Sequence, residues 1–142
     1  HFFWGSFDLA VTRFSGRPAP VHPGGFPGLP DPVTREAYSH EVSSAGFWPG
    51  NDAYPSAAFF SYAYPTRSGF GQAVVGPSGA FWSEALGEWM LPYAAGRAAA
   101  DPDAALLAFL SSSYRAASDL AGWDGGLECG MGVPGTPRAI HG

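Results

Sequence analysis

The segment from Pro102 to Ala121 constrains the fold most, because it is the one stretch whose pattern predicts a long helix. Asp101 precedes it as an N-cap, Pro102 occupies the first helical position, and Gly122 ends it. Apolar positions at helical spacing predict the packed face: Leu106, Leu110, Tyr114, Ala117 and Ala121. The rest of the chain is therefore expected to supply a surface for one face of this helix.

The segments before the helix alternate in polarity or are rich in aromatics, which predicts strands. From Phe2 to Phe14 the pattern predicts a single strand with one core face and one wetter face. The core face is expected to hold Phe3, Phe7, Leu9 and Val11, and the wetter face Trp4, Ser6, Asp8 and Thr12. Further strands are predicted at residues 38–48, 57–64, 80–82 and 88–91. The predicted fold is α+β, a small antiparallel sheet with one long C-terminal helix packed on a face.

Two regions are rich in proline and glycine, which sustain neither a helix nor a sheet ladder. Residues 15–32 are predicted to form a long surface loop, and residues 125–142 a tail that is wrapped on the surface or disordered. With 142 residues the chain suits one domain, predicted to be compact over residues 1–124.

The charge pattern excludes some classes of partner. Only 13% of residues are charged, the net charge is −5, and all seven basic residues are arginine. No basic surface is therefore expected for nucleic acid or anionic lipid. Cys129 is the only cysteine, which excludes an internal disulfide, and no apolar run approaches the ~18 residues of a membrane span. A cytoplasmic location is expected.

Residues 35–50 place His40 and Glu41 among hydroxyls and aromatic rings, which is the composition of a pocket wall. Imidazole and carboxylate groups are suitable zinc ligands, and an open coordination position acidifies a bound water. We expect a divalent metal, zinc, at His1, His40 and Asp8, although their spacing matches no zinc motif. The alternatives stay open: His40 as a hydrogen-bonded histidine in an aromatic cluster, and Asp8 as an acceptor for backbone or Arg13.

Glu88 and Glu41 are the predicted catalytic carboxylates, with Glu88 as base. Strand alternation puts His40 and Glu41 on opposite faces, so Glu41 is also interpreted as a structural acceptor. The predicted substrate pocket is lined by Trp4, Tyr38 and Trp48. The alternative is that such aromatic residues belong to the core.

Four stretches together resemble one bacterial family. They are residues 1–10, residues 39–50, the pair 86–88 and 91–93, and residues 101–103. The chain is similar over nearly its whole length to domain-of-unknown-function family 5996, for which no reaction is established, and it resembles the second half of longer members. A half-length chain is expected to leave apolar surface uncovered, which favours a homodimer.

Two functions follow as hypotheses. The first is a small metal-dependent hydrolase that acts on ester or phosphoester bonds of a moderately apolar small-molecule substrate. The second is a noncatalytic ligand-binding or assembly half-domain of a longer protein, which uses the same aromatic wall without a metal.

Overall fold

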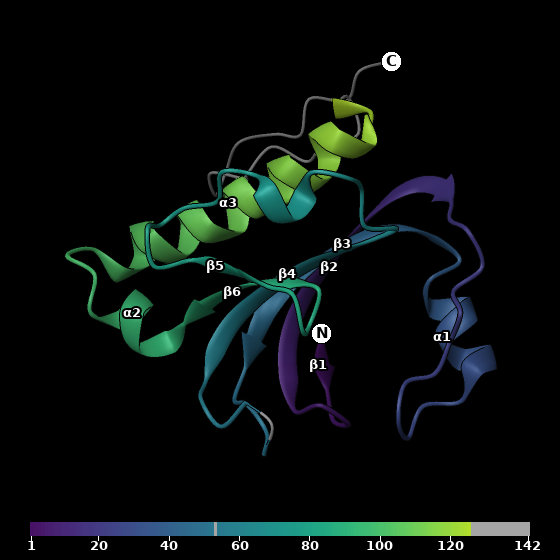
Figure 1. Cartoon of the computed structure of the whole chain (residues 1–142), viewed down its shortest axis with the longest axis horizontal. Coiled ribbons are helices and arrows are strands. Elements are labelled where there is room, and N and C mark those ends of the chain that lie inside the picture. The colour runs from purple at the N-terminus through teal and green to yellow at the C-terminus, as the bar shows by residue number, and fades with distance from the viewer. Residues whose placement is uncertain (53, 126–142) are drawn as a thin grey trace, which may run out of the picture.

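The computed structural model describes residues 1–52 and 54–125 (Figure 1). Its elements, in chain order, are β1 (Phe2–Phe3), β2 (Asp8–Pro18), α1 (Asp31–Ala37), β3 (His40–Trp48), β4 (Ala58–Tyr64), the 3₁₀ helix η1 (Phe70–Gln72), β5 (Phe81–Ser83), β6 (Glu88–Pro92), α2 (Tyr93–Arg97) and α3 (Pro102–Ala121). None of the helices in these ranges is both long and apolar enough to cross a bilayer.

All six strands form one antiparallel sheet in the order β1-β2-β3-β4-β6-β5. Helix α3 lies across one face of this sheet (Figure 1), which confirms the predicted α+β class with a single long C-terminal helix. We call the face toward α3 the helix side and the other face the open side. Because side chains alternate along a strand, each strand contributes to both.

The sequence signals at both ends of α3 are confirmed. The Asp101 side chain accepts a hydrogen bond from the Ala104 N–H at 3.0 Å, and Pro102 begins the helix. Gly122 ends it with a φ of 59°, a left-handed conformation in which glycine carries no Cβ penalty.

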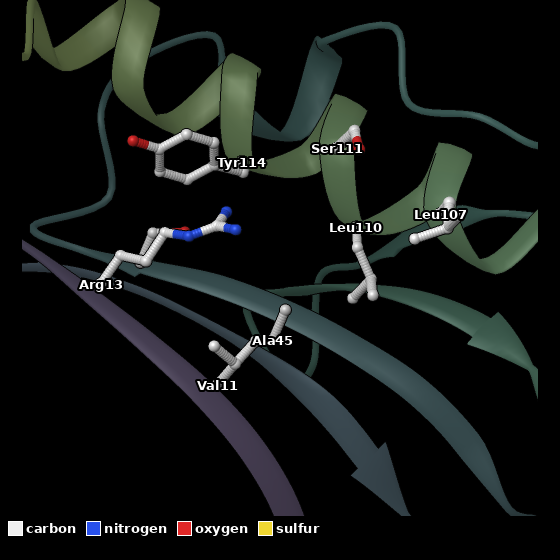
Figure 2. Close-up of a pocket in the computed structure, with 8 residues that line it drawn as sticks. Val11, Arg13, Ala45, Leu107, Leu110, Ser111 and Tyr114 are labelled. Atoms are coloured by element: carbon white, nitrogen blue, oxygen red, sulfur yellow. The ribbon is translucent and has the colours of Figure 1, made fainter. Parts of the chain in front are cut away.

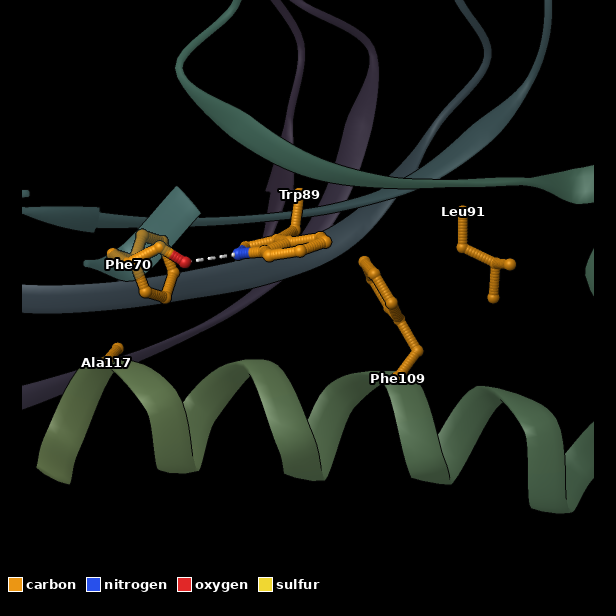
Figure 3. Close-up of a cluster of buried hydrophobic side chains, with 5 residues drawn as sticks. All are labelled: Phe70, Trp89, Leu91, Phe109 and Ala117. Atoms are coloured by element: carbon orange, nitrogen blue, oxygen red, sulfur yellow. Dashed lines mark hydrogen bonds between the residues drawn. The ribbon is translucent and has the colours of Figure 1, made fainter. Parts of the chain in front are cut away.

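The main core lies between α3 and the helix side of β6 (Figure 3). Phe109 rises from α3 between Trp89 and Leu91, and the Trp89 indole N–H donates to the Phe70 carbonyl at 3.0 Å. Phe109 and Leu91 are completely buried. Burying one such side chain stabilises the fold by roughly 1.5–3 kcal/mol, so this cluster fixes α3 on the sheet.

The predicted packing face of α3 is wrong, because the buried face is rotated about the helix axis from the predicted one. The buried helix residues are Ala105, Phe109, Ser113, Ala117 and Ser118, so only Ala117 of the predicted set is buried. Leu110 and Tyr114 are half-buried at the flank of the helix. Apart from Phe109, the contact uses small residues, which let the helix backbone approach the sheet, and the larger residues that the pattern favoured lie beside the contact.

The predicted strand from Phe2 to Phe14 is instead a hairpin, with a turn at residues 4–7 between β1 and β2. Its predicted core residues are exposed: Phe3, Phe7, Leu9 and Val11 keep 48–58% of their surface. Asp8, assigned to the wetter face, keeps only 8%. Leu9 and Val11 lie on the helix side of β2, beyond the core that β4 and β6 form under α3, whereas Asp8 lies on the open side. Phe3 lies in the edge strand β1 and Phe7 in the turn.

The predicted loop at residues 15–32 is too long at both ends. Strand β2 continues to Pro18, and α1 begins at Asp31, so only residues 19–30 lack regular structure. Asp31 holds the loop, since its Oδ1 accepts from the Gly25 N–H at 2.9 Å. The predicted tail lies outside the described residues, apart from residue 125.

The open side has its own smaller apolar cluster, formed by Ala10, Ala58, Phe60 and Met90 from strands β2, β4 and β6. Trp48, Tyr54 and Tyr62 pack around it. In the described part of the chain, no long helix covers this side (Figure 1). Polar groups beside the cluster therefore belong to a surface that the fold presents outward.

Candidate functional site

Four ionisable side chains from separate segments gather on the open side. Asp8 begins β2, Tyr38 follows α1, Tyr62 lies in β4, and Glu88 begins β6. Ser61 pairs with Trp89, so the next residues in the antiparallel register place Tyr62 beside Glu88. The charges of Asp8 and Glu88 both act on the ionisation of Tyr38. Strand order therefore assembles this group, which we call the acid–tyrosine site.

Two tyrosines form the centre of the acid–tyrosine site. The Tyr38 hydroxyl donates to the Tyr62 hydroxyl oxygen at 3.0 Å. Burial raises the pKa of Tyr38 above its ordinary value, and the neighbouring Tyr62 and the charges of Glu88 and Asp8 raise it further. Tyr38 thus keeps its proton, and its hydrogen bond polarises the Tyr62 O–H toward a further acceptor.

Glu88 is the side chain of this site whose pKa is raised toward neutrality. Burial raises the pKa of Glu88 to about 7, and the charge of Asp8 contributes to the rise. At neutral pH Glu88 therefore exists in both protonation states. A carboxyl group with a pKa near the working pH is suited to general acid–base chemistry.

Asp8 is the second carboxylate of the site and is 8% exposed. Its carboxylate accepts a hydrogen bond from the Ser6 hydroxyl, two residues earlier. Among the residues that the structure describes, neither Asp8 nor Glu88 forms an ion pair with an arginine. The two carboxylates therefore share one electrostatic environment without a compensating cation from this part of the chain.

His22, from the loop after β2, supports the tyrosine pair. Its ring stacks on Tyr38 at a centroid distance of 4.7 Å and on Phe26 at 5.3 Å. The Gly24 N–H donates to His22 Nδ1 at 3.0 Å, which fixes the orientation of a ring only 9% exposed. No sequence signal pointed to His22 or Tyr62; the first lies in a proline-rich loop and the second in an aromatic run typical of a core strand.

The three predicted pocket residues have different positions. Tyr38 lies in the acid–tyrosine site. Trp48 lies on the same open side and stacks on Tyr54 with ring centroids 5.8 Å apart. Trp4 lies in the turn between β1 and β2, is 80% exposed, and contacts the rings of Phe2 and Phe7. Only the first two share a face.

The predicted metal ligands are not all brought together. His40 begins β3 beside Pro18, whereas Asp8 precedes Leu9, which pairs with Phe47 near the other end of that strand. A separation of eight residues along β3 corresponds to roughly 25 Å. The amino group of His1 donates to the Ala10 carbonyl at 2.8 Å. Within residues 1–52 and 54–125, no group of three or more His, Cys, Asp or Glu side chains is placed to hold a metal ion.

Glu41 lies on the helix side, opposite to the acid–tyrosine site. Its carboxylate accepts from Arg17 at 2.7 Å, from Arg67 at 2.7 Å and from the Trp123 indole N–H at 2.9 Å. Burial acts to raise its pKa, but the hydrogen bonds from Arg17 and Ser15 and the charge of Arg17 outweigh burial, and the pKa is lowered. This geometry favours the interpretation of Glu41 as a structural acceptor.

Comparison with protein-family models matches residues 1–129 to a family of unknown function, DUF5996. No curated protein and no solved structure matches the chain. The match covers nearly the whole chain, including every strand and helix described above. That the chain represents the second half of longer members stays a prediction. The resemblance of the sequence motifs is thus confirmed at the level of the family, and the chain belongs to the family of unknown function DUF5996.

Proposed function

We propose that the protein binds a small, moderately apolar molecule at the acid–tyrosine site and hydrolyses an ester or phosphoester bond in it. The observation that carries the proposal is the convergence of two carboxylates and a hydrogen-bonded tyrosine pair on the open side of the sheet. Titratable groups with strongly shifted pKa values concentrate at functional sites, because catalytic acids and bases need pKa values matched to their task.

Each group has a role in this proposal. Glu88 in its ionised form takes a proton from water as the water attacks the ester carbon, and returns a proton to the leaving alcohol. The Tyr62 O–H, polarised by Tyr38, donates to the oxygen on which negative charge develops. Burial, together with the charge of Asp8, keeps the pKa of Glu88 high. The aromatic rings of Phe60 and Trp48 supply apolar contact.

Ester hydrolysis by three proteins tests the proposal: the wild type, Glu88→Gln and Glu84→Gln. Glu84 is an exposed carboxylate in the turn between β5 and β6, so it is the matched control. With a panel of p-nitrophenyl esters and phosphoesters, Glu88→Gln is expected to lose about 100-fold or more in kcat/KM, the lower range of a general acid–base contribution. Equal rates for all three proteins, or no turnover by the wild type, would contradict it.

Metal dependence is a separate part of the proposal. Zinc enzymes commonly use three protein ligands, and Asp8 and Glu88 are the carboxylates that the acid–tyrosine site offers. Elemental mass spectrometry of the purified wild type and of Asp8→Asn tests this part. Stoichiometric zinc that is lost in Asp8→Asn supports metal dependence, and full activity of zinc-free protein argues for acid–base catalysis by the side chains alone.

A noncatalytic role is the second candidate, because the same face offers stacked aromatic rings, including Phe60 on Tyr62 at 6.2 Å. Under this alternative, Glu88→Gln binds the ligand as tightly as the wild type does, and neither protein turns over any ester. Two sequence predictions accompany both candidates: a homodimer, tested by light scattering, and a cytoplasmic location.

A further inference from the structure

A small cavity of about 60 Å³ lies on the helix side, between α3 and strands β2 and β3 (Figure 2). It is on the opposite face of the sheet from the acid–tyrosine site. Its apolar walls come from Val11 and Ala45 on the strands and from Leu107 and Leu110 on the helix. The cavity forms here because the core under α3 is centred on β4 and β6, and β2 extends beyond that cover.

Ser43 supplies a polar group to this cavity. The residue is 4% exposed, and in the described part of the chain its hydroxyl has no hydrogen-bond partner, whereas the next residue, Ser44, pairs with Thr12 at 3.0 Å. Because Ser43 lines the cavity, this hydroxyl is open to the cavity space and is free to bond a ligand there.

Arg13 supplies a positive charge at the same cavity. Its guanidinium carbon lies 4.3 Å from the centroid of the Tyr114 ring, and this cation–π contact holds the side chain over the opening (Figure 2). Arg17 and Arg67 are paired with Glu41, but among the described residues Arg13 has no carboxylate partner. A held guanidinium without a counter-ion is suited to a planar anion.

We propose that this cavity binds a short aliphatic monocarboxylate. The carboxylate accepts from the Arg13 guanidinium and from the Ser43 hydroxyl, and the alkyl chain lies against Ala45, Val11 and Leu110. A single guanidinium matches the single charge and the fork geometry of a carboxylate. A cavity of about 150 Å³ holds benzene with its six carbons, so the space here holds roughly two to three heavy atoms, and the rest of the ligand extends through the opening. Exposed Val11 and Leu107 offer apolar contact to a longer chain at the opening.

Titration of ¹⁵N-labelled protein with butyrate at constant ionic strength tests this site. Saturable amide shifts are expected at Ser43, Ala45 and Leu110, whereas butanol and butylamine at the same concentrations are expected to produce none. Arg13→Gln is expected to weaken butyrate binding by about tenfold or more. The control is Arg97→Gln, an exposed arginine in α2, which is expected to bind as the wild type does.

Leu107→Trp is a second variant, at an exposed position of the opening. The larger side chain fills the cavity without removing a charge, so this variant is also expected to weaken butyrate binding. The amide spectrum of each variant shows whether it is folded. An absence of saturable shifts, equal binding of butanol, or equal losses in Arg13→Gln and Arg97→Gln would overturn the proposal. None of these outcomes depends on hydrolysis at the acid–tyrosine site.

Discussion

Glu41 and Glu88 are the two glutamates of the sheet with shifted acidity, and they lie in opposite environments. Glu41, on the helix side, accepts hydrogen bonds from two arginines, a serine and a tryptophan. Glu88, in the acid–tyrosine site, has no arginine partner in the described part of the chain. The pKa of Glu41 is accordingly lowered, and the pKa of Glu88 is raised to about 7.

One of these carboxylates stabilises the fold, and the other is available for chemistry. Arg17 binds Glu41 and also donates to the Ala121 carbonyl at 2.5 Å, so this ion pair joins β2, β3 and the C-terminal end of α3. Glu88 makes no comparable connection, and its burial beside Asp8 opposes its ionised form. We therefore expect loss of the charge at Glu41 to lower stability, and loss of the charge at Glu88 to lower activity without lowering stability.

The largest expected effect on stability is that of Glu41→Gln. Removing the charge leaves Arg17 and Arg67 without their partner and is expected to lower the free energy of unfolding by about 2–3 kcal/mol. This loss is smaller than that for a fully buried ion pair, because both arginine side chains keep nearly half of their surface exposed. Urea denaturation at pH 7 measures the loss. The control is Glu36→Gln, an exposed glutamate of α1, and equal midpoints for the two variants would contradict the structural role of Glu41.

Glu88→Gln is expected to change stability in the opposite direction. Because the folded-state pKa is raised, the unfolded chain loses this proton first, so the stability of the wild type falls as the pH rises from about 4.5 through about 7. Glutamine does not ionise, and the variant is expected to be more stable than the wild type by about 1–3 kcal/mol at pH 8 but not at pH 4. Urea midpoints at both pH values test this, and a variant less stable than the wild type at pH 8 would contradict it.

Tyr38→Phe gives the smallest expected effect. It removes the hydrogen bond to Tyr62 and is expected to cost about 1 kcal/mol. Tyr93→Phe removes a hydroxyl from a tyrosine that is 40% exposed and serves as the control. A comparable loss of thermal stability in both variants would show that the Tyr38–Tyr62 bond adds nothing specific to the open side.

Local signals predicted some parts of the fold and failed for others. The caps of α3 were predictable because Asp101 and Gly122 act within their own turn. The face of α3 that packs was not, since hydrophobic spacing favours Leu110 and Tyr114, whereas the close contact with the sheet selects Ala105 and Ser113. Short α1 and α2 were missed because neither contains enough turns to establish a helical period.

The acid–tyrosine site shows the same limit. Asp8, Tyr38 and Glu88 could be named from residue type and pattern, but their proximity depends on β6 pairing with β4, which leaves β5 at the edge. Strand order is a property of the whole sheet and cannot be predicted from any one segment of the sequence. Tyr62 resembled a core residue for the same reason, because its neighbour Glu88 comes from a distant part of the chain.

The pKa of Glu88 is the most direct test of the account, and ¹³C NMR titration of its side-chain carboxyl measures it in the wild type and in Asp8→Asn. Glu84 in the same spectra serves as an exposed reference. We expect a wild-type pKa of about 7 and a lower pKa in Asp8→Asn, because the neighbouring charge is removed. A wild-type value near the ordinary 4.5 would contradict the acid–tyrosine site as a centre of proton transfer.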